Sequence, residues 1–446
     1  MSMTLFKNAT LVNDGQSFKA DLLVEDQRIA RIADSIEATE GVDVIDASGK
    51  YLLPGMIDDQ VHFREPGAPH KADMHTESRA AVAGGITSFM DMPNTNPQTV
   101  TVEALEDKFK LAANRCYANY AFYMGTTNDN LDEIRKLGKN QTCGIKVFMG
   151  ASTGNMLVDN EQVLEGIFKE APCMVVTHCE DTPMILALEE QYRQKYGEDV
   201  PMSAHPEIRS AEACLKSSSF AIGLAKKHGT RLHVLHLTTE IELDQFEKGS
   251  PDNKQITAEA CVHHTYFDES DYADKGSLIK CNPAIKKHSD REALRQALAD
   301  GRLDVIATDH APHTLEEKAN TYFKAPAGLP LVQHALQMAL ELVHDEVLSL
   351  EQVVEKTAHA PARMFGIVER GYLREGYFAD LVLVDLQRSE TVSRDKILYK
   401  CGWSPMEGRT LHSSIAATMV NGQLLYKDGE FVSDVAAGQR LLFNRS

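Results

Sequence analysis

Eight short apolar runs, each followed by a stretch with helical spacing, constrain the fold of this chain more than any other feature. The runs lie between residues 55 and 312 and read GMIDDQVHF, GITSFMDMPN, YAFYMG, GIKVFMG, MVVTHCE, LHVLHLT, ITAEACVHH and DVIATDHAP. Between them, stretches such as VEALEDKFKLAANR and DREALRQALADG repeat apolar residues with the period of a helix. Strands that are apolar on both faces and alternate with helices are typical of parallel sheets. Eight such units predict an α/β protein with a (β/α)8 barrel, and no GxGxxG or Walker motif favours a doubly wound nucleotide-binding sheet.

The two ends of the chain have a different sequence pattern, with short strand-like runs and turn residues. Residues 1–54 contain short strand-like runs separated by Gly, Asp and Asn, and the same pattern returns near the end in ADLVLVDL and SIAATMVNGQLLYKDGEFV. NG and DG stand at hairpin positions in the second of these segments. We therefore expect residues 1–54 and 366–446 to form one small β-sandwich domain, with the barrel at 55–365.

Charge and composition exclude several classes of protein. The chain has 46 Lys and Arg against 65 Asp and Glu, a net charge of −19, which argues against nucleic-acid binding. No apolar run is long enough to span a membrane, and the N-terminal residues lack the apolar core of a signal peptide. The 8 cysteines are scattered without CxxC spacing, so neither a disulfide framework nor a zinc finger is expected. These features predict a reduced, cytoplasmic protein.

Polar side chains gather where the eight runs end. In a barrel these positions meet at one mouth, which is where catalytic groups belong. A single histidine at a strand end is more often a satisfied polar residue than a ligand, and Asp309 could equally cap a helix. Three histidines and one aspartate from four different runs, however, suit a divalent metal such as zinc. The residues concerned are Gln60, His62, Arg64, Asn94, Lys146, His178, His236, Asp309 and His313.

The order of motifs along the chain resembles the dihydroorotases of the amidohydrolase superfamily. The blocks that carry this resemblance are PGMIDDQVHFREPG, MPNTNP, GIKVFMGASTGNM, THCED, HVLHLTTE, KCNPAIKK and DVIATDHAPHTLEEK, and they cover nearly the whole chain in order. The resemblance implies a metal-dependent barrel with a β-sandwich built from both chain ends. It also implies reversible hydrolysis of dihydroorotate to N-carbamoyl-L-aspartate in pyrimidine biosynthesis. The substrate would be a small molecule, and a homodimer is compatible with the resemblance.

The same resemblance implies a role for each candidate residue. His62 and Gln60 look like ligands of a first zinc ion, which Asp309 shares, and His178 and His236 look like ligands of a second. A free ammonium cannot bind a cation, so Lys146 would act as a bridging ligand only after conversion to a carbamate, a modification that the resemblance alone suggests. Asp309 would also move the proton, as one group can serve as base and then acid. Arg64, Asn94 and His313 resemble the groups that hold the substrate carboxylate, and Asn282 resembles a ring contact.

One glutamine and three histidines need separate interpretations. Gln60 departs from the family pattern, in which the first strand carries His-x-His, and a neutral amide oxygen suits zinc less well than imidazole does. One or two zinc ions per chain are therefore expected, the first less tightly held. His233 lies out of phase with His236 and is expected to be packed or outward-facing. His263 and His264 are either hydrogen-bonding neighbours of the site or the polar end of the seventh strand.

Two alternatives remain open at this point. A related cyclic amide hydrolase, such as an allantoinase or a hydantoinase, should lack the carboxylate-binding set of Arg64, Asn94 and His313. A non-catalytic scaffold for a partner such as aspartate transcarbamoylase finds support only in Gln60. A scaffold has no physical need for the buried polar groups of a metal site.

Overall fold

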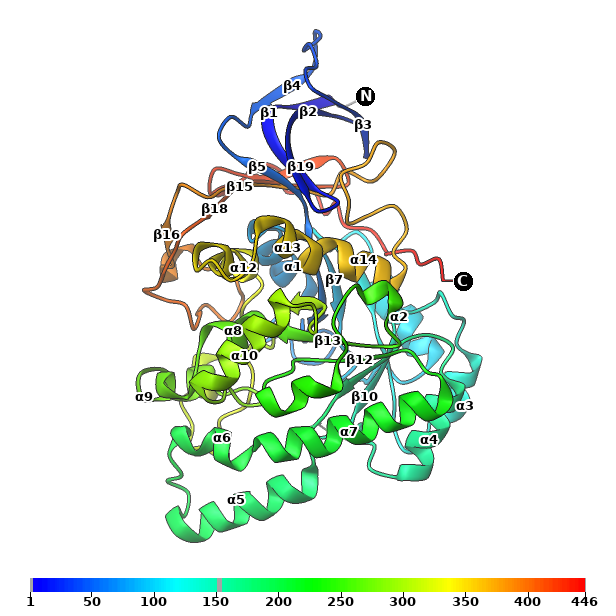
Figure 1. Ribbon diagram of the computed structural model, residues 1–446, viewed down its shortest axis with the longest axis vertical. Coiled ribbons are helices and arrows are strands. Elements are labelled where there is room, and N and C mark those ends of the chain that lie inside the picture. The colour runs from blue at the N-terminus through cyan, green and yellow to red at the C-terminus, as the bar shows by residue number, and fades with distance from the viewer. Residues whose placement is uncertain (1–2, 151–154, 446) are drawn as a thin grey trace.

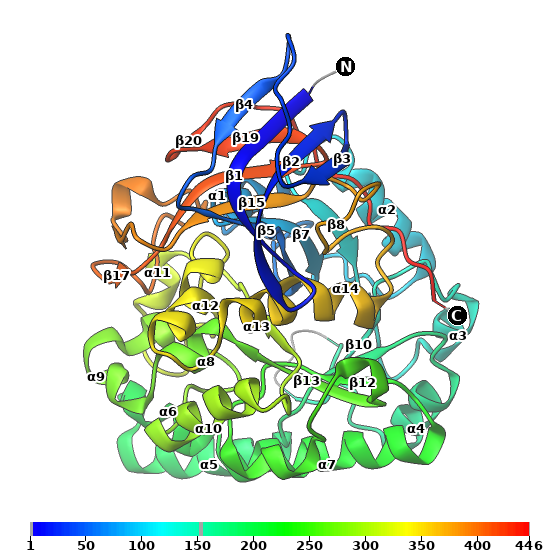
Figure 2. The ribbon, with the colours of Figure 1, turned by 45° about the horizontal axis from the view of Figure 1, so that its top comes forward.

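The computed structural model describes residues 3–150 and 155–445, and it has a mixed α/β architecture (Figure 1). A body with a parallel-strand interior and surrounding helices carries at one end a β-rich part, made from the blue N-terminal and the orange-red C-terminal segments (Figures 1 and 2). Among the described residues, no helix is long and apolar enough to cross a membrane.

The parallel strands follow one another in chain order. They are β6 (Met56–Val61), β7 (Ile86–Asp91), β8 (Asn119–Phe122), β9 (Met124–Gly125), β10 (Ile145–Phe148), β11 (Val175–His178), β12 (Leu232–Val234), β13 (Ile256–Cys261) and β14 (Val305–Ala307). One sheet pairs β6, β7 and β8 in order, and another pairs β9 to β14. Val61 of β6 also bridges in parallel to His310, just beyond β14. The last parallel strand therefore lies beside the first, and all carboxyl ends face the same side.

Burial explains why these segments form parallel strands. Every residue of β6, β7, β10 and β11 is buried, as expected for strands covered on both faces. Each of the eight predicted runs contains a strand. The seventh ends earlier than its run, because the chain turns after Cys261 into α8 (Val262–Tyr266), which carries His263 and His264.

Helices separate the parallel strands and cover their outer side (Figure 1). Side-chain caps set several of their limits: Ser210 accepts from the Ala213 N–H at the start of α7, and Gly229 ends that helix with φ 70°. The helices are α1 (Met74–Ala83), α2 (Val102–Ala112), α3 (Leu131–Lys136), α4 (Glu161–Glu170), α5 (Thr182–Tyr196), α6 (His205–Ile208), α7 (Ala211–His228), α8, α9 (Tyr272–Lys275), α10 (His288–Ala299), α11 (Leu315–Lys318), α12 (Ala335–His344), α13 (Leu350–Val354) and α14 (Ala360–Phe365).

Strands from both chain ends combine in one nine-stranded sheet. Its members are β1 (Met3–Asn13), β2 (Gln16–Glu25), β3 (Arg28–Ala33), β4 (Asp43–Asp46), β5 (Tyr51–Pro54), β15 (Leu381–Asp385), β18 (Ser414–Val420), β19 (Gln423–Lys427) and β20 (Glu430–Phe431). The N-terminal half joins the C-terminal half where β5 pairs with β15. A separate short pair is formed by β16 (Glu390–Thr391) and β17 (Thr410–Leu411).

Successive residues along the strands of this sheet pack alternately into two different hydrophobic cores. Leu52 and Leu383 pack in a core of the β-rich part itself. Leu53 and Val382, their neighbours in sequence, pack into the large core that also contains the parallel strands. Because successive strand residues point to opposite faces, one face of the sheet holds its own core and the other is bound to the body that carries the cavity described next.

Candidate functional site

A cavity of about 350 Å³ opens at the carboxyl ends of the parallel strands. Its lining includes every residue that the sequence proposed for the site. The lining residues are Gln60, His62, Arg64, Asn94, Lys146, Phe148, His178, Arg209, His236, Asn282, Asp309, Ala311, His313, Pro326, Ala327 and Gly328. They come from segments up to 268 positions apart in the sequence, from 60 to 328.

Local backbone conformation turns three of these side chains toward the cavity. Arg64, His236 and Asp309 each lie just beyond a parallel strand and have positive φ values of 63°, 38° and 48°. Left-handed backbone is costly for residues other than glycine and is concentrated at functional sites. The chain thus leaves its extended course at the point where these side chains enter the cavity.

His62, Asp309 and Gln60 form the first polar group. The His62 Nε2 atom lies 3.1 Å from Asp309 Oδ1, and the other ring nitrogen, Nδ1, lies 2.9 Å from Asn94 Oδ1. A protonated ring donates Nδ1–H to the Asn94 oxygen and Nε2–H to Asp309, whereas a neutral ring with its proton on Nδ1 directs its Nε2 lone pair at the Asp309 carboxylate. A cation between these two acceptors would stabilise that arrangement.

Gln60 contacts the same carboxylate through its amide nitrogen. Its Nε2 donates to Asp309 Oδ1 at 3.2 Å, and its Oε1 lies 3.8 Å from the Cys261 thiol. Burial acts to raise the pKa of Asp309, but the hydrogen bond and charge of His62 hold it below its usual value. Asp309 therefore stays ionised at neutral pH.

His178 and His236 form the second polar group. The His178 Nδ1 and His236 Nε2 atoms are 3.0 Å apart, and His178 Nε2 lies 2.8 Å from Glu180 Oε2. The Nδ1 atom of His236 is buried without a hydrogen-bond partner. Burial lowers the pKa of both rings, and in His236 the neighbouring His178 and Lys146 lower it further. Neutral imidazole is the form that binds metals.

Lys146 lines the cavity near both of these groups, since its charge acts on His236 and on Asp309. It is 1% exposed, no hydrogen bond or ion pair connects its Nζ to another described residue, and its Nζ lies 4.6 Å from the centroid of the Phe148 ring. Burial lowers its pKa to about 8, although Asp309 and Glu259 act in the opposite direction. Its amine is thus more readily neutral than an ordinary lysine, and only a neutral amine can react with carbon dioxide.

Arg64 and His313 lie together on another wall of the cavity. Arg64 Nη2 is 2.9 Å from His313 Nε2, and Arg64 Nε donates to the Pro312 carbonyl at 3.0 Å. Lys71 Nζ approaches the other His313 nitrogen at 3.0 Å. Burial, and then the charges of Arg64 and Lys71, hold the pKa of His313 well below its usual value. This wall is positively charged and suits an anionic group.

Two residues at the site, the buried Glu180 and the partly buried Arg209, had no part in the sequence prediction. Glu180 is fully buried and accepts hydrogen bonds from Arg209 and His178. Burial acts to raise the pKa of Glu180, but Arg209 and His178 lower it to about 2. Its position two residues after His178 in the THCED block was a usable signal, whereas nothing in the sequence around Arg209 pointed to the cavity.

Other polar residues near the strand ends have structural partners. Asp58 accepts from the Thr308 hydroxyl at 2.6 Å and does not line the cavity, so it does not replace a histidine at position 60. His264 Nε2 lies 3.2 Å from the Pro283 carbonyl, and its ring lies 3.9 Å from that of His263. His233 is fully buried, in agreement with a packed rather than a ligating role in this cavity.

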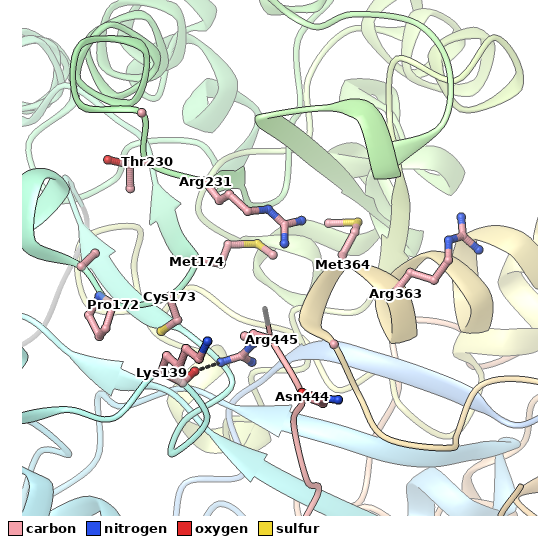
Figure 3. Close-up of a pocket in the computed structure, with 13 residues that line it drawn as sticks. Lys139, Pro172, Cys173, Met174, Thr230, Arg231, Arg363, Met364, Asn444 and Arg445 are labelled. Atoms are coloured by element: carbon pink, nitrogen blue, oxygen red, sulfur yellow. Dashed lines mark hydrogen bonds between the residues drawn. The ribbon is translucent and has the colours of Figure 1, made fainter.

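A second cavity, of about 360 Å³, lies near the amino ends of β11 and β12 (Figure 3). Its lining includes Met174 and Arg231, each directly before one of these strands, and Arg445, which donates to the Lys139 carbonyl at 2.6 Å. None of the residues that the sequence proposed lies there.

Comparisons with known proteins agree with this geometry. The model of the amidohydrolase family matches residues 51–425. A dihydroorotase of Halobacterium salinarum is 34% identical over 436 residues, which cover 97% of this chain and 98% of its own. An allantoinase of Bacillus velezensis is 32% identical over 433 residues, covering 95% and 94%. The solved structure of an L-hydantoinase (dihydropyrimidinase) from Arthrobacter aurescens superposes with a TM-score of 0.93 at 29% identity, covering 99% of this chain and 100% of that one.

Proposed function

Because the chain belongs to the amidohydrolase family and is a hydrolase of cyclic amides, we propose that it is a dihydroorotase. It would interconvert dihydroorotate and N-carbamoyl-L-aspartate in de novo pyrimidine biosynthesis. Several curated dihydroorotases resemble it over nearly their whole length, which supports the proposal.

The positively charged wall of Arg64 and His313 is the observation that carries this choice. Dihydroorotate bears a carboxylate on its ring, whereas unsubstituted hydantoin does not. A guanidinium matches a carboxylate with two parallel hydrogen bonds. Asn282 adds a buried Oδ1 atom without a partner in the cavity lining, which suits an N–H of the substrate ring.

The polar groups of the cavity fit divalent zinc, one or two ions per chain. His62, Asp309 and Gln60 would hold the first ion, His178 and His236 the second, and Lys146, as a carbamate, would bridge them. The 3.0 Å between His178 Nδ1 and His236 Nε2 is close to the separation of about 3.3 Å between two nitrogen ligands of tetrahedral zinc. When bound, the metal would lower the pKa of water and polarise the amide carbonyl.

The protein's own residues would orient the substrate and move the proton. Asp309 is ionised and buried, so its Oδ atoms can take a proton from the attacking water and return it to the leaving ring nitrogen. Gln60 donates to this carboxylate directly, and Asn94 holds its other partner, His62, in place. Arg64 fixes the ring through its carboxylate, which sets the distance between the scissile amide and Asp309.

A hydantoinase or allantoinase activity is the second candidate. Its support is the similarity to an allantoinase at 32% identity and to an L-hydantoinase at a TM-score of 0.93. Assays of the purified, zinc-loaded protein with dihydroorotate, allantoin and hydantoin separate the candidates. We expect the highest kcat/KM for dihydroorotate and cyclisation of N-carbamoyl-aspartate at lower pH, because cyclisation consumes a proton. A higher kcat/KM for allantoin or hydantoin would show that the protein is an allantoinase or a hydantoinase and not a dihydroorotase.

We also assign the parallel strands to a (β/α)8 barrel spanning residues 55–365, with residues 1–54 and 366–446 as one β-sandwich domain. The bridge between Val61 and His310, which joins the two ends of the strand series, supports closure. The pairing of β5 with β15 supports a common domain for the two chain ends.

A further inference from the structure

Asp59, His233 and Glu259 form a second cluster of ligand-type side chains, separate from the cavity. They belong to β6, β12 and β13, and each is 0% exposed. None of the three lines the cavity at the strand ends. One ligand atom from each side chain lies within 4.8 Å of the others.

The distances within this cluster match a metal coordination sphere. His233 Nε2 lies 3.1 Å from Glu259 Oε2 and 3.4 Å from Asp59 Oδ2. Ligands of tetrahedral zinc at about 2.0 Å stand about 3.3 Å apart. The 3.4 Å contact is longer than an ordinary N–H···O hydrogen bond.

The carboxylate of Asp59 provides an independent indication of a ligand site between these three side chains. Both of its carboxylate oxygens are buried without a hydrogen-bond partner. A buried carboxylate without a partner is costly, and such groups in proteins normally pair or bind metals. One oxygen of Asp59 lies within 4.8 Å of the other two ligand atoms, and Asp59 Oδ2 is 3.4 Å from His233 Nε2.

The hydrogen bonds of His233 direct its Nε2 atom into the same space. Its Nδ1 lies 2.8 Å from the Thr257 hydroxyl oxygen, and that hydroxyl donates to the Leu232 carbonyl at 3.4 Å. The hydroxyl oxygen therefore accepts from Nδ1–H. A protonated ring donates Nε2–H to the carboxylates, whereas a ring that has given up this proton to a bound cation directs its Nε2 lone pair at the same enclosed point.

We propose that Asp59, His233 and Glu259 bind a divalent cation of the zinc type inside the ring of parallel strands, distinct from the metal site at the strand ends. The second oxygen of Asp59 is available as a fourth ligand. Two carboxylates and a divalent cation sum to zero charge. A metal-free cluster reaches the same charge only with protons on both His233 and Glu259: burial acts to lower the pKa of His233 but the carboxylates raise it to about 9, and burial raises the pKa of Glu259 to about 8. This inference does not depend on which cyclic amide the enzyme hydrolyses.

This cation, called the inner cation below, would also stabilise the geometry of the proposed metal site at the strand ends, called the outer site below. The other Glu259 oxygen, Oε1, accepts a hydrogen bond from the His236 backbone N–H at 3.1 Å. A cation that fixes the Glu259 carboxylate would therefore fix the backbone of His236, which has a positive φ. It would also connect β6 to β12 and β13.

Anomalous diffraction at the zinc absorption edge tests this proposal directly in crystals of the zinc-replete protein. We expect a peak about 2 Å from His233 Nε2, Asp59 Oδ2 and Glu259 Oε2, in addition to density at the strand ends. The peak should persist after a chelator has emptied the outer site, because the inner ligands have no solvent exposure. Absence of an inner peak before chelation would overturn the proposal in favour of a proton-sharing cluster.

Metal content of isosteric variants gives a second measurement. Asp59→Asn should lower zinc by about one equivalent per chain, since an amide is a poor ligand for zinc. Asp58→Asn is the matched control: its carboxylate is equally buried but accepts from the Thr308 hydroxyl and N–H, so metal content should not change. Equal zinc content in the wild-type protein and a folded Asp59→Asn variant would contradict the proposal. If Asp59→Asn does not fold, the wild-type anomalous map alone decides.

Discussion

Arg64 combines a strained backbone, burial and a guanidinium aimed at the cavity. Its φ of 63° and the burial that lowers its pKa to about 10 both cost free energy in the folded state. A residue that contributed only to stability would not be expected in a backbone conformation and an environment that both cost folding free energy. The same reasoning applies to His236 and Asp309, whose backbones are also left-handed.

Replacing Arg64 by Lys keeps the charge but removes the two-pronged contact with a carboxylate. We expect kcat/KM for dihydroorotate to fall about 10- to 100-fold, which corresponds to about 1.5–3 kcal/mol for a charged hydrogen bond. Hydantoin, which has no carboxylate, is the control substrate and should lose much less. Equal losses for both substrates in steady-state assays would exclude a carboxylate contact.

Lys146→Ala removes the amine that would form the bridging carbamate. We expect zinc content and activity to fall together, and short carboxylic acids such as acetate to restore part of both by occupying the space. Lys356→Met is the matched control, because Lys356 is also buried but donates to the Leu303 carbonyl far from the cavity. A Lys146→Ala protein with full zinc content by mass spectrometry would show that this lysine is not a ligand.

Gln60→His creates the His-x-His pair that the resemblance to dihydroorotases leads us to expect on the first strand. The Gln60 amide nitrogen, not its oxygen, faces Asp309, so we expect the wild-type protein to hold the first zinc weakly. The substitution should raise the zinc retained after dialysis toward one more equivalent at the strand ends. Two tightly held outer ions in the wild-type protein would argue that Gln60 already serves as a ligand after its amide rotates.

Caps set the limits of the helices at the scale of single elements. The 18-residue helix α7 begins where Ser210 accepts from the Ala213 N–H, and Arg209, one residue earlier, reaches the site through Glu180. The start of this helix thus fixes a residue that contacts the cavity. A change in the cap should affect both stability and the position of Arg209.

Ser210→Ala should lower the free energy of unfolding by about 1 kcal/mol, because an N–H at the helix start loses its acceptor. Ser219→Ala in the same helix is the control, since its hydroxyl makes an exposed contact with Gln245, and we expect a change below about 0.5 kcal/mol. Chemical denaturation measures both. A smaller effect at Ser210 than at Ser219 would rule out a capping contribution.

At the scale of the whole molecule, a buried polar network joins the β-rich part to the parallel strands. Asp380, directly before β15, accepts hydrogen bonds from Arg370 and from Asn119 of β8. Asn421, directly after β18, donates its backbone N–H to the same aspartate. This network and the shared hydrophobic core hold the nine-stranded sheet against the body (Figure 2).

Arg370→Met leaves the Asp380 carboxylate buried without its cation. Breaking a buried ion pair in this way should cost about 3–5 kcal/mol of unfolding free energy. Arg374→Met is the control, because the ion pair of Arg374 with Asp14 is about half exposed and worth below about 1 kcal/mol. Similar losses in both variants, measured by denaturant titration, would count against a structural role for the Asp380 network.

Local sequence patterns were sufficient to locate the parallel strands and to predict that the candidate site residues lie near one another. Strands buried on both faces must be apolar throughout, so each of the eight runs was visible without tertiary information. Side chains at the ends of such runs must converge at one edge, and for this reason nine proposed residues, from Gln60 to His313, line a single cavity. Asn282, which only the family resemblance suggested, lines the same cavity. The family to which the chain belongs was recognisable from the same blocks.

Only the tertiary structure decided which distant side chains contact each other. Arg209 reaches Glu180 from a loop that carries no strand-end signal, and the orientation of the Gln60 amide depends on Asp309, 249 positions later. His233 was expected to be packed or outward-facing; it is packed in the interior, where it contacts Asp59 and Glu259 from two other strands. Sequence periodicity predicts which face of an element a residue occupies, but the partner across the interior depends on strand register and on local bulges such as the one in β6 after Asp58.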